Sequence, residues 1–63
     1  MMVQTSSADM ATILIFETNR VGIAVKHSVQ GETHTIKANT PCLNSNAWFK
    51  HKCDQLGLET KEE

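Results

Sequence analysis

The sequence predicts an α+β fold, in which a three-stranded antiparallel meander is followed by one C-terminal α-helix packed on one face of the sheet (βββα). Three observations lead to this prediction. Residues 11–38 are rich in β-branched and apolar residues that alternate with polar ones. Short gaps divide this region into strand-length segments. Residues 45–58 then carry apolar side chains at helical spacing.

The three strand-like segments span residues 11–18, 21–29 and 32–38. Asn19-Arg20 separates the first pair and Gln30-Gly31 separates the second. Both gaps have the length of a tight hairpin loop, and Asn and Gly tolerate the backbone conformations that such loops require. The expected topology is therefore two consecutive hairpins.

Two-residue loops at both gaps define a register. This register places His27 opposite His34 and brings apolar residues from all three strands to one face. The predicted apolar face consists of Leu14, Phe16, Ile23, Val25, Ile36 and Ala38. Agreement between the two hairpins is the main support for the meander.

The predicted helix covers this apolar face. At about 100° per residue, three apolar side chains form one stripe. They are Phe49, Cys53 and Leu56. Trp48 lies at the edge of the stripe, and Gly57 offers a C-terminal stop.

The domain is expected to span residues 11–58, between a flexible polar tail at 1–10 and a charged tail at 59–63. At 63 residues, the chain has room for one small core. No stretch resembles a signal peptide or a membrane span, so we expect a cytoplasmic protein without a membrane partner.

Catalysis and metal binding are not expected. No Gly-rich phosphate loop or oriented Cys-His pair is visible, which argues against an enzyme and against a cofactor. The one arrangement suited to zinc pairs His27 with His34, with Cys42 or Cys53 as a further ligand. No established zinc spacing is present, and we interpret the histidines as a pair at the rim of the core with no metal.

The preferred function is a small non-enzymatic protein-interaction module, an adaptor or inhibitor of the size encoded by phages and mobile elements. Ile13, Ile15 and Ala24 fall on the second face of the predicted sheet, where no element covers them. Residues 11–18 also form an edge strand, which favours pairing with another chain. We therefore expect a homo-oligomer that also engages an unidentified protein partner, unless one of the tails covers these residues.

The alternative function is nucleic-acid binding. Residues 20–53 contain five basic residues and one acidic residue, and both flanking segments are acidic. The basic residues are Arg20, Lys26, Lys37, Lys50 and Lys52. In its order of elements, the predicted fold resembles the small DNA-binding domains of phage-type integrases, and this resemblance implies contact between the sheet and the major groove.

Overall fold

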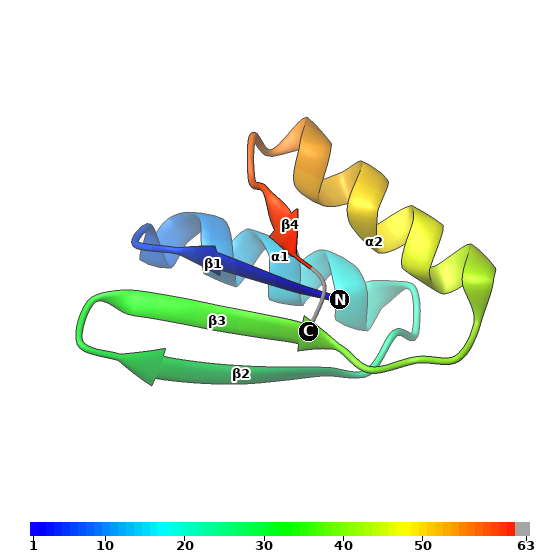
Figure 1. The fold of residues 1–63 in the computed structure, drawn as a ribbon, viewed down its shortest axis with the longest axis horizontal. Coiled ribbons are helices and arrows are strands. Elements are labelled where there is room, and N and C mark those ends of the chain that lie inside the picture. Colours follow the sequence, from blue (N-terminus) through cyan, green and yellow to red (C-terminus); the bar gives the residue numbers. More distant parts are fainter. Residues whose placement is uncertain (62–63) are drawn as a thin grey trace.

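The computed structural model describes residues 1–61 and has the element order βαββαβ (Figure 1). The elements are β1 (Met2–Thr5), α1 (Ala8–Arg20), β2 (Val25–Gln30), β3 (Thr33–Ala38), α2 (Leu43–Gln55) and β4 (Thr60–Lys61). The predicted α+β class with an antiparallel sheet is confirmed. The prediction of three strands and one helix is wrong, because the described residues form four strands and two helices.

The four strands form one sheet in the order β2-β3-β1-β4, and each neighbouring pair is antiparallel. β1 and β2 therefore run parallel with β3 between them, and α1 connects them across the sheet. β3 and β4 are likewise parallel, with β1 between them and α2 as the connection. Two such split βαβ units give the ferredoxin-like topology, an arrangement that many unrelated functions share.

Residues 11–18 are helical, which corrects the predicted first strand. Ser7 caps the helix, since its hydroxyl accepts a hydrogen bond from the Met10 amide at 3.2 Å. The helix ends in a Schellman motif, in which the Ile23 amide donates to the Thr18 carbonyl and Gly22 adopts a φ of 82°. Residues 21–24 are consequently a loop rather than the start of a strand.

The hairpin between β2 and β3 is confirmed, but its loop is shifted. The loop is Gly31-Glu32, so Gln30 pairs with Thr33. Gly31 has a φ of 63°, and a positive φ is what a type II′ turn requires at its first central residue. No non-glycine residue between 1 and 61 has a positive φ. The register thus differs by two residues from the predicted one. A shift of two preserves the face on which each side chain lies.

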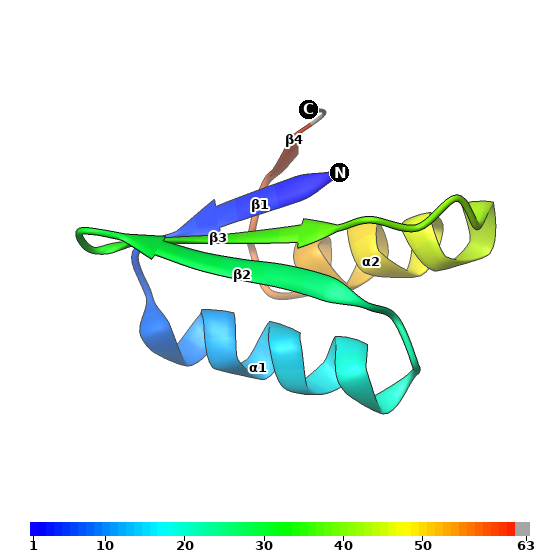
Figure 2. The same cartoon turned by 90° about the horizontal axis from the view of Figure 1, so that it is seen from below.

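One core joins the helices to a single face of the sheet (Figure 2). The fully buried cluster consists of Val3, Ala11, Leu14, Ile36, Ala38, Phe49 and Cys53. Ile23 is also buried, as predicted, while Val25, Trp48 and Leu56 are partly buried around the cluster. Phe16 is the exception, since on a helix it points away from Leu14, whereas on a strand the two would share a face.

The predicted tails contribute strands, which corrects the expected domain limits of 11–58. Met2–Thr5 forms β1 in the interior of the sheet, where Val3 is fully buried. In the second tail, Thr60–Lys61 forms β4 against β1. Residues 62–63 lie outside the described residues. Within residues 1–61, neither helix combines the length and apolarity that crossing a membrane demands.

Replacement of Phe49 by Ala tests the core. Phe49 is the largest fully buried side chain, so Phe49→Ala should lower the free energy of unfolding by about 3–5 kcal/mol. Leu43→Ala is the control, because Leu43 is 83% exposed and its truncation should change stability by less than about 0.5 kcal/mol. Urea denaturation followed by circular dichroism measures both, and equal midpoints would contradict the assigned core.

Candidate functional site

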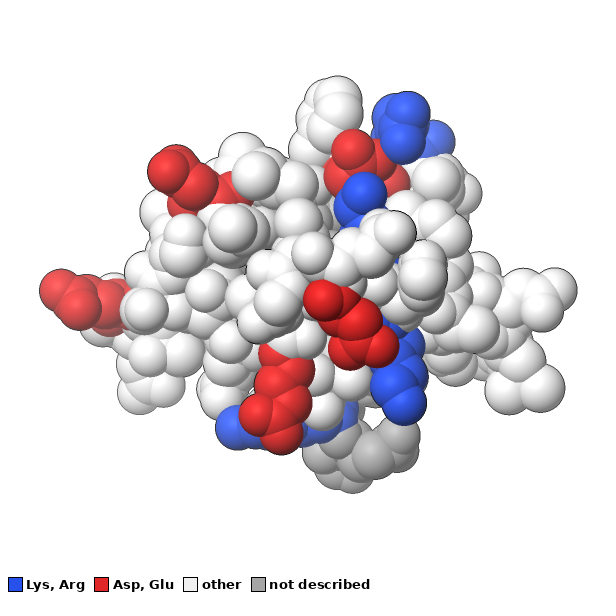
Figure 3. Space-filling view, turned by 90° about the horizontal axis from the view of Figure 1, so that it is seen from above, with Lys and Arg blue, Asp and Glu red and all other residues white. Residues whose placement is uncertain are grey.

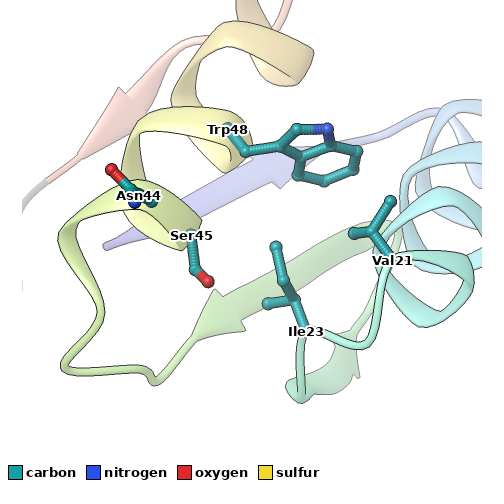
Figure 4. A pocket seen from close by; sticks show the side chains of 5 residues that line it. All are labelled: Val21, Ile23, Asn44, Ser45 and Trp48. Atoms are coloured by element: carbon teal, nitrogen blue, oxygen red, sulfur yellow. The ribbon is translucent and has the colours of Figure 1, made fainter.

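A groove lies between the C-terminal end of α1 and the first turns of α2 (Figure 4). Val21, Ile23, Asn44, Ser45 and Trp48 line it, and its volume is about 210 Å³. Figure 4 shows the indole ring on one side of the groove and the two aliphatic side chains on the other. The groove therefore presents an apolar surface with two polar groups at one end.

Local structure explains why these residues meet. The Schellman motif turns the chain sharply after α1 and brings Val21 and Ile23 toward α2. Asn44, Ser45 and Trp48 lie at helical spacing and face the same side of α2. Within residues 1–61, no acidic or basic side chain lines the groove, so the described chemistry is apolar contact plus hydrogen bonding by an amide and a hydroxyl.

Sequence reasoning missed this groove. The strand predicted over residues 21–29 places Ile23 on the sheet face beneath the helix, but it lacks the loop at 21–24 that brings Val21 and Ile23 to Asn44 and Ser45. Gly22 is a signal for the end of a helix, and this reading indicates a loop at residues 21–24.

The predicted interface residues do not share a surface. Ile13 is on the outer side of α1 and is exposed, whereas Ile15 is partly buried against the core. Ala24 is exposed in the loop before β2. The expected edge strand at 11–18 is absent because those residues form a helix.

Two predicted basic residues meet on the sheet face that the helices leave uncovered. Lys26 and Lys37 are directly opposite in the register of β2 and β3. Met2 pairs with Lys37 on one side and with Lys61 on the other, so Lys61 joins the same row. These three lysines, the lysine row, cross the sheet roughly perpendicular to its strands. The row concentrates positive charge on this face of the sheet, and directly opposed like charges are unfavourable in a strand pair.

The other predicted basic residues lie elsewhere. Arg20 is on α1 and forms an ion pair with Glu17 at 2.7 Å. Lys50 and Lys52 are on α2. Figure 3 shows basic and acidic side chains interspersed over the face that it draws. The predicted set is divided between the two helices and the β2–β3 hairpin.

His27 and His34 do come together, although by a diagonal contact rather than the predicted direct opposition. In the observed register His27 faces Ile36 and His34 faces Val29. The two rings stack at a centroid distance of 5.3 Å, and His27 Nε2 lies 3.0 Å from His34 Nδ1. Within residues 1–61, no group of three side chains of His, Cys, Asp or Glu is placed to hold a metal ion.

The two cysteines have opposite environments. Cys42 is exposed at the N-cap of α2, and hydrogen bonds from the Ser45 hydroxyl and from the backbone of Ser45 and Asn44 lower the pKa of its thiol. Cys53 is buried in the core, where desolvation and the nearby charge of Asp54 raise the pKa of its thiol to about 11. Only Cys42 is thus both accessible and disposed to ionise.

Comparison with known proteins finds no matching family model, curated protein or solved structure. The order of elements behind the resemblance to integrase domains is also not the one observed.

Thiol labelling tests the contrast between the cysteines. Near pH 8, a disulfide reagent should modify Cys42 quickly in the folded protein and reach Cys53 only after denaturation, because the thiolate is the reactive form. Absorbance of the released thiolate measures both phases. Cys42→Ser should remove the fast phase, and rapid modification of both thiols in the folded state would contradict the burial of Cys53.

Proposed function

We propose that the protein is a small non-enzymatic protein-interaction module that recognises an apolar side chain of its partner in the groove of Val21, Ile23 and Trp48. The groove carries this proposal. Its volume of about 210 Å³ is below the roughly 300–1,000 Å³ of pockets that enclose small ligands, and it suits one inserted side chain. Asn44 carries an amide at the end of the groove, and the Ser45 hydroxyl, which donates to Cys42, keeps its oxygen as an acceptor for the backbone around that side chain.

Exposed apolar side chains support the same proposal. The large hydrophobic residues that remain exposed are Ile13, Phe16, Val21, Val29 and Leu43. Single exposed apolar residues such as Leu43 need no explanation, but Val21 is exposed next to the groove, where it adds to one apolar surface with Ile23 and Trp48. Trp48 adds an aromatic side chain of the kind that dominates binding energy at protein interfaces.

Paired lysine substitutions test the groove. Val21→Lys places a charge at the groove, whereas Leu43→Lys makes the same kind of change at an exposed position that does not line it. The immobilised protein is incubated with extract of the source cell, and bound proteins are quantified by mass spectrometry. Val21→Lys should reduce capture of the specific partner at least tenfold, since about 1.4 kcal/mol corresponds to tenfold in affinity.

The Leu43→Lys control should retain the wild-type partner. Circular dichroism of both variants checks that they are folded. A partner retained equally by both variants would show that the groove is not the binding surface, and the proposal would fail.

Nucleic-acid binding is a second candidate, favoured by the lysine row. Lys26, Lys37 and Lys61 lie on a sheet face that no helix covers, together with uncharged polar side chains such as Gln4 and Thr35. Such a face suits the backbone of a single strand, which lysines contact through its phosphates. Aromatic side chains for base stacking are absent from the described part of this face, so any binding would be chiefly electrostatic.

Salt dependence tests this second candidate. Phosphate contacts by Lys26 and Lys61 on single-stranded DNA predict a slope of about −1.4 for log affinity against log salt concentration. Lys26→Gln should reduce the slope by about 0.7, and Lys50→Gln on α2 should leave it unchanged. Fluorescence anisotropy with a labelled oligonucleotide measures the slope, and equal effects of the two substitutions would exclude the lysine row.

A further inference from the structure

The outer face of α1 carries two large apolar side chains that no described element covers. Ile13 is 43% exposed and Phe16 is 65% exposed. The core-facing side of the same helix is formed by Ala11, Leu14 and Thr18, so Ile13 and Phe16 lie on the opposite side. Figure 2 shows α1 as the outermost layer on that side of the sheet.

These two residues belong to a stripe with charged ends. Asp9, Ile13, Phe16 and Arg20 are separated by four, three and four residues, which places them along one side of a helix. The acidic residue is in the first turn of α1 and the basic residue in its last turn. The spacing of four, three and four residues is the same from either end of the helix.

We infer that α1 packs against α1 of a second copy of this chain, antiparallel, about a two-fold axis that passes the middle of the helix. This homodimer rests on the proposed interaction function but uses a surface other than the groove. The axis places Ile13 against Phe16 of the second copy, and Asp9 against Arg20 of the second copy. Each contact occurs twice, as in every isologous interface.

Charge complementarity favours a second copy of the chain with its α1 antiparallel to the first. A parallel pair would oppose Asp9 to Asp9 and Arg20 to Arg20, whereas the antiparallel pair joins unlike charges at both ends. The existing ion pair of Arg20 with Glu17 does not oppose this arrangement. It is a surface pair on an exposed Arg20 side chain, and Arg20 has several donors to share between two carboxylates.

The interface is small, because each copy contributes one side of a helix of 13 residues. Interfaces of this size lie at the weak end of specific association, and we expect a dissociation constant on the order of 100 µM. The dimer should therefore form at high concentration and dissociate on dilution.

Charge reversal tests the pairing. Asp9→Arg gives a helix with basic residues at both ends, and Arg20→Asp gives one with acidic residues at both ends. Each variant alone should be monomeric at a concentration of about 1 mM, since like charges then face each other. An equimolar mixture should associate as a heterodimer at least as tightly as the wild type. Sedimentation velocity measures all three samples, and circular dichroism confirms that each variant is folded.

Phe16→Lys should abolish association, whereas Leu43→Lys and the groove variant Val21→Lys should associate like the wild type. A wild-type protein that stays monomeric at about 1 mM, or a mixture that does not associate, would overturn the dimer. Either result would leave the groove experiment unaffected, because its readout is partner capture. Loss of association in Val21→Lys would likewise overturn the α1 interface and point to the groove as the contact between copies.

Discussion

The fold depends on the insertion of β1 between β3 and β4. β1 hydrogen-bonds to both neighbours, and within the described residues β4 pairs only with β1. The Met1 carbonyl extends the contact by accepting a hydrogen bond from the Ala38 amide at 3.0 Å. Val3 fills the centre of the core from this strand. Because β1 and β2 are not adjacent, the chain between them must cross the sheet. α1 therefore packs on the apolar face of the sheet, and the opposite side of α1 is exposed to solvent.

The helical state of residues 11–18 illustrates the limit of local propensity. Ile13, Ile15 and Phe16 favour strands in general, because such side chains pack well on a pleated surface. Two other signals in the sequence oppose this preference. Ser7 is a good N-cap, and the apolar residues Ala11, Leu14 and Ile15 are at helical spacing, which the structure uses to bury them fully or partly. Propensity is the weaker signal, since tertiary packing supplies more free energy than intrinsic preference does.

Much of the core was nevertheless predictable, for a geometric reason. The hairpin of β2 and β3 was assigned with a register error of two residues, and such an error leaves every side chain on its own face. Ile36 and Ala38 were therefore placed correctly, as were Phe49 and Cys53 on the second helix. The groove was not predictable in this way. It requires the end of one helix to meet the start of another, and no short-range pattern specifies that contact.

The candidate surfaces follow from the size of the chain. A single layer of helices on one side of a sheet buries one face of each element and leaves the other face in solvent. The groove occupies the junction of the helices, the lysine row occupies the open face of the sheet, and the apolar stripe occupies the outer side of α1. The apolar stripe and the groove are lined by different residues, so an antiparallel α1 dimer leaves the groove residues out of the contacts between copies. A dimer then presents two identical sites, and a partner with two matching segments gains affinity through effective concentration without any new contact.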